Sequence, residues 1–441
     1  MPRTIRRAVV SVRVPARRSL ALSVTFACSS AVALAFTPVF TPALAAAPSD
    51  TGDTLSLNID EAVRRATESS PVVQRARAER RIVESRRVEA DLLLPANPML
   101  LVGAGPTRGP GETREVGYVA RLEQTVEVAG QRGTRQAEVA RAVEAAMARE
   151  ELARAEARAR TRLAYTAARL AEAQLTYAVE REALATRIEE SVRERVRLGA
   201  ASDIESRLAT LERGRVRRDR LEAAQAAADG LSALREAVFL PPMTPLLLTT
   251  PVGPPVGPLP SYAAAVEAAE RRRAELRLLA AQGDELGASI VRLRREALPS
   301  PTVFLDLQRD RPGELLLRAG LGVPLPTWRR NQGQIALVAA TRARIDDERT
   351  LAQRTIALEI DRALRAAQRR LEEVDLDGRE IVPAAEAALE LTTEGWRAGK
   401  FDLFRVIQVS REAGEARRHQ IEALGSLWQA SIELDRATGT P

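Results

Sequence analysis

Apolar residues recur about every three and a half positions over long stretches of this chain. The repeat is clearest between Gln131 and Arg197, where no proline interrupts it. Four of its apolar residues lie seven positions apart: Leu163, Leu170, Tyr177 and Leu184. This spacing predicts one helix of about 67 residues, roughly 100 Å long. Helices of this length pack as coiled coils rather than around a globular core.

Two glycines interrupt the helical pattern at corresponding places. Gly199 ends the first long helix, and the apolar period resumes over a second helix at about 203–239. In the C-terminal half, Gly399 separates helices at about 332–398 and 403–437. A left-handed or otherwise strained backbone is expected of a glycine at the end of a helix. Each half is therefore predicted to contain a long helical hairpin.

Two further breaks are expected in the second half. A helix is predicted from about Tyr262 to Ala297, and Pro383 should interrupt the helix that begins near Gln332, because proline cannot donate a backbone hydrogen bond. Between the halves, eight prolines gather in residues 241–260 and forbid a helix there. This Pro-rich segment is predicted to be a linker.

Apolar and polar residues alternate in four shorter segments. The predicted strands are about 98–106 and 115–126 in the first half, and about 301–309 and 314–323 in the second. Period-two runs of about 10 residues, separated by turns, are typical of membrane barrel strands. Two exposed hairpins that cap a helical protein are the alternative. Four strands cannot close a membrane barrel, and an open edge is not tolerated in hydrocarbon, so the barrel interpretation requires several copies of the chain.

The two halves repeat one another about 200 residues apart. Gly133 corresponds to Gly333 and Gly199 to Gly399, and Leu94-Pro95-Ala96 corresponds to Leu298-Pro299-Ser300. Landmarks in the same order at a nearly constant offset indicate a tandem duplication. The predicted organisation is a first repeat over 46–240 and a second over 261–441. The fold class is mainly α with a small β part, a strand hairpin and a long helical hairpin being present twice.

The N-terminal residues 1–45 read as a signal peptide. A basic segment with six arginines precedes an apolar stretch, and Ala43-Leu44-Ala45 has the small-x-small pattern of a cleavage site. Cys28 raises the question of lipidation, but the Thr25-Phe26-Ala27 before it lacks the expected aliphatic residue, so we expect none. The apolar stretch contains small residues and prolines, which disfavours a transmembrane anchor.

Removal of this leader changes the charge of the chain. Taking its six arginines from the 66 basic residues leaves 60 against 59 acidic residues. A nearly neutral chain offers no case for nucleic-acid binding. No stretch beyond the leader approaches 18 consecutive apolar residues, so no transmembrane helix is expected there. Export then leads either to a secreted or periplasmic protein, or to a barrel in an outer membrane.

Residues for catalysis or metal binding are scarce. His419 is the only histidine, and no cysteine remains after the leader, which excludes thiolate sites and histidine-based triads. Paired acids such as Asp346-Asp347 fall in helices, where a solvated face explains them. No glycine-rich phosphate loop is present. We predict no enzyme, no cofactor and no metal site.

Three local motifs carry a family resemblance. Residues 124–132, QTVEVAGQR, join a strand to a helix, as do residues 323–333, VPLPTWRRNQG. Residues 394–403, EGWRAGKFDL, surround the second helical turn. Together with the signal peptide and the duplicated hairpins, these motifs resemble the TolC-type outer membrane efflux protein family, and the second joint is similar to that of its heavy-metal efflux branch. The resemblance covers nearly all of the chain after the leader.

The resemblance implies a homotrimeric conduit in the outer membrane, in contact with its lipid. Three chains would form one 12-stranded β-barrel, continued by an α-helical tunnel into the periplasm. The Pro-rich linker would lie at its equator. The tunnel tip would meet a periplasmic adaptor protein, itself bound to an inner-membrane proton-driven pump. Passive, porin-like conduction of metal ions or small toxic compounds is the implied function.

The resemblance also designates site residues around the two helical turns. Adaptor docking is expected at the tips, formed by Arg197, Leu198, Gly199, Arg397, Gly399 and Lys400. The tunnel aperture is expected to contain Asp203, Glu205, Asp402, Arg405 and Gln408. Where well-known members hold acidic residues, this chain holds Arg405 and Gln408. We therefore predict that Arg405 pairs with Glu205, Asp203 or Asp402 when the aperture is closed; an ordinary exposed helix arginine is the alternative.

Two other functions share parts of this pattern. The exit duct of a type I protein secretion system has the same fold, and neighbouring genes would distinguish it from an efflux channel. A periplasmic coiled-coil scaffold would explain the helices but not the alternating strands. The substrate cannot be named from the sequence, because a passive duct inherits its specificity from the pump.

Overall fold

The computed structural model describes residues 54–440, apart from 108–114, 256 and 310–313. Residues 52–441 form one compact unit, and the following description concerns that unit. The predicted signal peptide, 1–45, and Cys28 within it lie outside the described residues.

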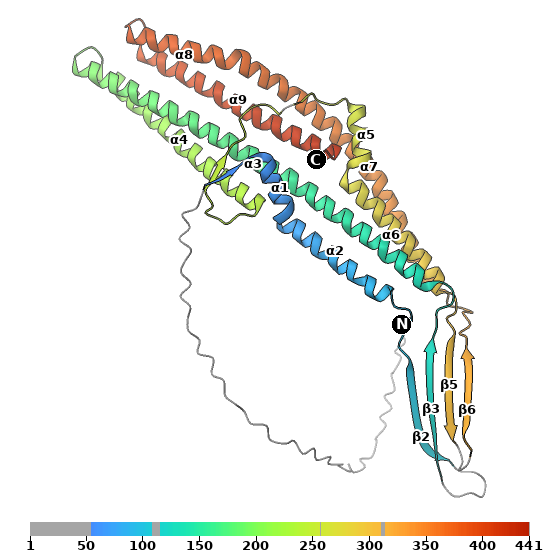
Figure 1. Cartoon of the computed structure of the whole chain (residues 1–441). Coiled ribbons are helices and arrows are strands. Elements are labelled where there is room, and N and C mark those ends of the chain that lie inside the picture. The colour runs from blue at the N-terminus through green and yellow to red at the C-terminus, as the bar shows by residue number, and fades with distance from the viewer. Residues whose placement is uncertain (1–53, 108–114, 256, 310–313, 441) are drawn as a thin grey trace, which may run out of the picture. The chain divides into compact units, whose positions relative to one another are not determined.

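The first repeat begins with a short strand and two helices, followed by a strand hairpin and a helical hairpin (Figure 1). The elements are β1 (Leu55–Leu57), α1 (Ile59–Ser69), α2 (Pro71–Ala90), β2 (Met99–Thr107), β3 (Glu115–Thr125), α3 (Gln131–Arg197) and α4 (Asp203–Val238). The four predicted elements from β2 to α4 start and end within one or two residues of their expected positions.

The second repeat has the same plan. Its elements are β4 (Leu246–Leu248), α5 (Tyr262–Arg272), α6 (Ala274–Glu296), β5 (Thr302–Arg309), β6 (Leu316–Gly322), α7 (Gln332–Leu376), a π-helical turn (Asp377–Ile381), α8 (Val382–Arg397) and α9 (Leu403–Thr438). Helices α4 and α9, which end the two repeats, have 36 residues each.

The start of each long helix shows the duplication in atomic detail. Gly130 and Asn331, the residues before α3 and α7, both have a left-handed backbone. The side chain of Gln131 accepts a hydrogen bond from the Ala129 amide, and Gln332 accepts the same bond from the Arg330 amide. Equivalent residues are therefore 201 positions apart here, so Gly133 corresponds to Gln334 and not to Gly333 as expected, and they are 200 apart at the helical turns.

Two helix breaks differ from the prediction. The predicted helix 262–297 is divided at Arg273, whose backbone is extended and whose buried side chain contacts Glu359 and the Ala437 carbonyl. Pro383 was expected to interrupt the helix. It does not end the helical path, because it lies in the first turn of α8, where no N–H donor is required. The π-helical turn before it absorbs the irregularity, with the Val382 amide bonded to the Asp377 carbonyl.

The four long strands form one antiparallel sheet in the order β2-β3-β5-β6. The two hairpins meet at β3 and β5, where Leu122 lies opposite Leu305. Among the residues that the structure describes, strands β2 and β6 each have a single strand neighbour. The sheet therefore ends in two unpaired edges.

The linker between the repeats contributes a short parallel strand pair that the sequence did not reveal. Strand β4 lies within 241–260 and pairs with β1 near the N-terminus. The hydroxyl of buried Tyr165 donates to the Leu57 carbonyl and accepts from the Thr250 amide. Leu57, Leu234 and Leu248 pack around this tyrosine. The linker is thereby fastened to the middle of α3.

Helices α2, α3, α6 and α7 are neighbours in that order. Each continues directly into one strand of the sheet: α2 into β2, β3 into α3, α6 into β5, and β6 into α7 (Figure 1). The helices thus repeat the order of the strands. None of the described helices combines the length and apolar character needed to cross a bilayer.

Candidate functional site

The two helical hairpins end in turns of the same construction. Gly199 and Gly399 have φ angles of +72° and +73°, in the left-handed region expected of them. The amides of Gly199 and Ala200 bond to the carbonyls of Val196 and Arg195, and the second turn repeats this pattern. The turns lie together, at the end of the helices remote from the sheet (Figure 1).

A shared apolar core holds the two hairpins together just below the turns. Val192 of α3 is buried with Trp396 of α8 and Val406 of α9. The Arg195 guanidinium lies 5.4 Å from the centre of the Trp396 ring. The remaining members of the core are Ile188, Ala209, Leu403 and Ile407. This packing gives the two turns a defined relative position.

The predicted tip residues all lie on the surface. Arg197, Leu198, Gly199, Arg397, Gly399 and Lys400 are exposed. Sequence reasoning missed two further apolar side chains beside them. Ile204 is 70% exposed and Phe404 is 64% exposed, and they occupy equivalent positions in the two repeats. Their position at the start of a helix, on the side that faces solvent, could have identified them from the sequence.

The predicted aperture residues cluster at the starts of α4 and α9, where two of them act as helix caps. Glu205 and Ser202 form a capping box, in which the carboxylate accepts from the Ser202 amide at 2.8 Å. Asp402 accepts from the backbone amide of Arg405 at 2.8 Å. The Arg405 guanidinium lies 5.3 Å from the centre of the Phe401 ring.

The predicted carboxylate partners of Arg405 are not paired with it within one chain. Asp203 and Gln408 are exposed, and Gln408 donates to Glu412 on its own helix. Among the described residues, Arg405 forms no ion pair with Glu205, Asp203 or Asp402. The predicted pairing therefore concerns contacts between chains and stays a prediction.

A different ion pair joins the two hairpins, and sequence reasoning did not identify it. Arg411 of α9 binds Glu212 of α4 through two nitrogens, at 2.5 and 3.1 Å. Glu212 is 8% exposed. The hydrogen bonds that Arg411 donates to the Glu212 carboxylate raise the pKa of Arg411. The pair lies about two turns further from the tip than Arg405, so it holds the two hairpins together at a second depth.

A second buried carboxylate joins the two helices of the first hairpin. Glu189 of α3 is 1% exposed and contacts Arg213 of α4 at 2.7 Å, Thr210 at 2.7 Å and Arg193 at 2.7 Å. Two arginines and a hydroxyl surround its charge, so burial is compensated. This network stiffens the first hairpin near its end.

The sheet has one apolar and one polar face. Leu305, Leu317 and Leu321 are exposed on one face. On the other face Asp306 is 1% exposed and lies 2.8 Å from Arg318 and 3.5 Å from Arg121, its partners on the adjacent strands. Such alternation is typical of the strands of a membrane barrel.

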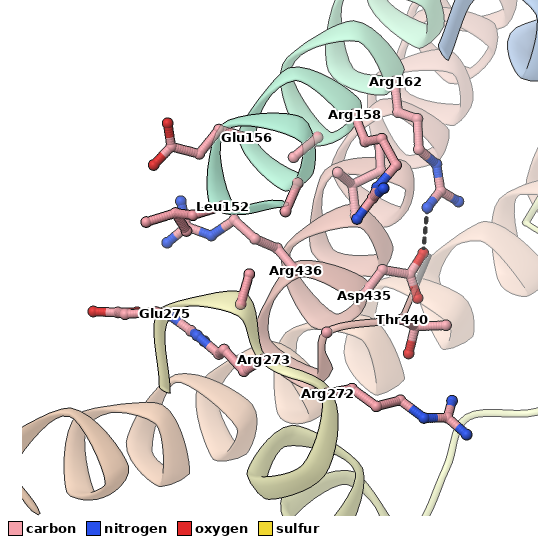
Figure 2. Close-up of a pocket in the computed structure, with 15 residues that line it drawn as sticks. Leu152, Glu156, Arg158, Arg162, Arg272, Arg273, Glu275, Asp435, Arg436 and Thr440 are labelled. Atoms are coloured by element: carbon pink, nitrogen blue, oxygen red, sulfur yellow. Dashed lines mark hydrogen bonds and ion pairs between the residues drawn. The ribbon is translucent and has the colours of Figure 1, made fainter. Parts of the chain in front are cut away.

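A small arginine-rich pocket lies where the end of α9 packs against the break between α5 and α6 (Figure 2). Its volume is about 250 Å³. Arg162 lies 2.7 Å from Asp435, and buried Arg273 is satisfied by Glu359 and the Ala437 carbonyl. Glu156 points away from the space between the helices in this view. We interpret the pocket as part of the packing between α3, α6 and α9, with a structural role.

The described residues contain no group of three or more potential metal-binding side chains. His419 is exposed and lies 3.7 Å from Glu422 on the same helix. It has the environment of an ordinary surface histidine.

No protein-family model matches the sequence. A search of curated proteins finds the cobalt-zinc-cadmium resistance protein CzcC of Cupriavidus metallidurans, which is 30% identical over 156 residues. The match covers 33% of this chain and 35% of that protein. The chain thus aligns with about a third of the length of this relative.

Solved structures of similar fold match nearly the whole chain. The outer membrane protein VceC of Vibrio cholerae has a TM-score of 0.67 at 14% identity, covering 86% of this chain and 96% of its own. CusC, described as forming a transmembrane channel, has a TM-score of 0.68 at 13% identity, covering 87% of this chain and 92% of its own. The chain therefore has the fold of the TolC-type outer membrane efflux channels, and its sequence resembles their metal-resistance branch.

Proposed function

We propose that this chain is the outer membrane channel of a tripartite efflux system, passively conducting substrate that an inner-membrane pump and a periplasmic adaptor deliver. One observation carries the proposal: a four-stranded sheet with two unpaired edges is joined, strand by strand, to helices that end in paired hairpin tips. The agreement with channel structures over 86–87% of the chain supports it. The chain acts as a duct and not as an enzyme.

The sheet edges are the reason to expect a trimer in the outer membrane. Unpaired β2 and β6 leave backbone donors and acceptors that hydrocarbon does not tolerate. Three copies joined edge to edge form a barrel of 12 strands, with the face of Leu305 and Leu317 toward lipid and the face of Asp306 toward the lumen. The helices then form a tunnel that extends into the periplasm.

The tips are the proposed contact with the adaptor. Exposed Leu198, Ile204 and Phe404 offer apolar contacts, and Arg197, Arg397 and Lys400 add positive charge around them. Buried apolar anchors within a polar rim are the usual composition of a protein interface. A partner with apolar sockets and acidic neighbours would fit this surface. The pump is expected to be proton-driven.

The aperture is proposed to be closed by charged contacts at two depths. Arg411 and Glu212 tie the two hairpins within each chain. Arg405 is exposed beside Phe401. Its proposed partner in the closed state is Glu205, Asp203 or Asp402 of the adjacent chain. Partly desolvated, charge-assisted hydrogen bonds are strong enough to hold a closed state and weak enough for adaptor binding to break.

Metal ions or small toxic compounds are the proposed substrates, because the curated relative is a cobalt-zinc-cadmium resistance protein. An exit duct of type I protein secretion is the second candidate. Deleting the gene should sensitise cells to these metals, and supplying the intact gene should restore resistance. Unchanged metal tolerance, together with loss of an exported protein from the medium, would favour the secretion duct instead.

A further inference from the structure

The pocket between α3, the end of α9 and the α5–α6 break has an excess of positive charge (Figure 2). Five of the residues that line it are arginines, and three are acidic. The ion pairs among these residues determine how much of the positive charge is compensated within the chain.

Two of the five arginines have a carboxylate partner from the same pocket. Arg162 lies 2.7 Å from Asp435, and buried Arg273 lies 3.1 Å from Glu275. The third acidic residue, Glu156, is exposed and points away from the space between the helices (Figure 2). The acidic residues of the pocket therefore leave the other three arginines uncompensated.

These three arginines are Arg158, Arg272 and Arg436, and none has a hydrogen-bond or ion-pair partner among the described residues. Arg272 and Arg436 are exposed and lie in the last turns of α5 and α9, where the helix dipole stabilises a positive charge. Arg158 differs, because it lies well inside α3 and is half-buried. A partly buried charge without a partner is costly unless an anion compensates it.

The neighbour of Arg158 along the helix increases this cost. Arg158 and Arg162 lie one turn apart on α3 and extend toward the same space beside Asp435 (Figure 2). Like charges four residues apart on a helix repel each other. The Asp435 carboxylate contacts only one of the two arginines. An anion between the two guanidinium groups would replace their repulsion by attraction to a common partner.

The start of α6 adds hydrogen-bond donors to the same pocket. Ala274 and Glu275 line it, and Arg273, the residue before them, gives α6 no side-chain cap. The backbone amides in the first turn of a helix favour an anion. Gly439 packs closely here: its φ is +69°, and an added Cβ would come within 2.8 Å of the backbone of Arg272 and Arg273. The end of α9 and the start of α6 are therefore held together.

We propose that this pocket binds a multivalent oxyanion, such as phosphate or sulfate, between Arg158, Arg162 and the first turn of α6. Guanidinium groups bind such anions through pairs of parallel hydrogen bonds. The cavity of about 250 Å³ holds a tetrahedral oxyanion together with several waters, each of about 30 Å³. The bound anion joins α3, α6 and α9 and stabilises their packing. This inference does not depend on the proposed conduction.

Thermal unfolding of the whole detergent-solubilised protein tests the site, with inorganic phosphate as the probe and chloride at equal ionic strength as the reference. An anion that binds the folded protein raises its melting temperature, and the increase grows only slowly once the site is filled. Wild type should show this increase at millimolar phosphate. Arg158→Gln should lose it, whereas Arg158→Lys should retain part of it.

Arg187→Gln is the matched control. Arg187 is another arginine of α3 without an ion-pair partner among the described residues, but it lines a different pocket together with Glu386 and Glu390. This variant should respond to phosphate as wild type does, which separates binding at the site from a general effect of phosphate on the solvent.

The melting temperature without phosphate distinguishes an anion site from an arginine that only packs. In chloride, Arg158→Gln should melt at or above the wild-type temperature, because the repulsion with Arg162 is removed. An equal loss of stability with and without phosphate would overturn the inference. So would an Arg158→Gln variant that responds to phosphate as strongly as wild type, or a wild-type protein that does not respond.

Discussion

Gly199 and Gly399 are single residues on which the geometry of the tips depends. At φ values of +72° and +73°, a side chain with a Cβ is strained by roughly 1–2 kcal/mol, and a β-branched one by more. We expect Gly399→Val to abolish efflux while the protein still assembles in the membrane. Growth on toxic metal and the amount of membrane-bound trimer are the two measurements.

Gly214 provides the matched control for this variant. It lies inside α4, without a positive φ and with no atom within 4 Å of an added Cβ. Gly214→Ala should preserve efflux and stabilise the helix by about 1 kcal/mol. If Gly399→Val exports as well as wild type, the tips do not dock the adaptor.

The tip glycines were predictable from sequence because only a local backbone conformation was required. Glu205 was harder to interpret, although Ser202 and Glu205 have the spacing of a capping box. In the capping box the Glu205 carboxylate binds the Ser202 backbone amide, although the sequence had suggested it as a partner of Arg405. Arg411 and Glu212 gave no sequence signal, because their pairing depends on how two hairpins 199 positions apart pack together.

Glu285 predicts a pH dependence of stability. Burial raises its pKa, against the opposing effects of Arg149 and Arg86. A carboxyl group with a raised folded pKa favours the native state at low pH and loses this contribution as the pH rises through the folded pKa. Glu285→Gln should therefore raise the melting temperature at neutral pH and not below about pH 4, near the pKa of an unfolded glutamate. Asp284→Asn, at the exposed neighbouring position, is the control; a pH-independent gain at Glu285 would contradict the argument.

At the scale of elements, the Arg411–Glu212 pair links α9 to α4. Removing the arginine leaves the buried Glu212 carboxylate with only its longer contact to Arg215, at 3.9 Å on its own helix, which costs about 1–3 kcal/mol and loosens the hairpins. Arg411→Gln should raise the single-channel conductance in planar bilayers. Arg218→Gln removes an exposed pair with Glu222 on one helix and should leave the conductance unchanged. Equal conductance in all three proteins would mean that closure depends on helix packing alone.

The sheet contains a glycine whose neighbour fills the space above it. A Cβ on Gly320 would clash with the Phe304 ring, whereas one on Gly322 would meet only a carbonyl oxygen at 3.8 Å. Gly320→Ala should therefore lower the yield of assembled protein, with overpacking costing about 1–3 kcal/mol. Gly322→Ala should assemble nearly as well as wild type, and Phe304→Leu should partly rescue Gly320→Ala. Indistinguishable yields for the two alanine variants would refute the contact.

Long helices and alternating strands were predictable because their periodicity repeats many times. The pair β1–β4 was not, since each strand has three residues and its partner is 191 positions away. The division at Arg273 also escaped prediction, because the apolar period continues across it and tertiary contacts with Glu359 hold the break. The local sequence pattern therefore predicted the helices and strands, whereas the β1–β4 pairing and the division at Arg273 depend on tertiary packing.

At the scale of the whole molecule, the two edges of the sheet require a neighbouring copy. Among the described residues, β2 and β6 have no second strand neighbour, and each lies at an outer edge of the sheet. A ring of copies satisfies the backbone groups of these strands. The channel is therefore expected to exist only as an assembly.

Sedimentation of the detergent-solubilised protein tests this central claim most directly, with its strand content monitored by circular dichroism. We predict a species with the protein mass of three chains, about 48 kDa each before removal of the leader. Strand and helix signals should be lost together when the trimer is dissociated by heat, because the strands cannot persist with open edges in an apolar environment. A stable monomer that retains its strands would contradict the account.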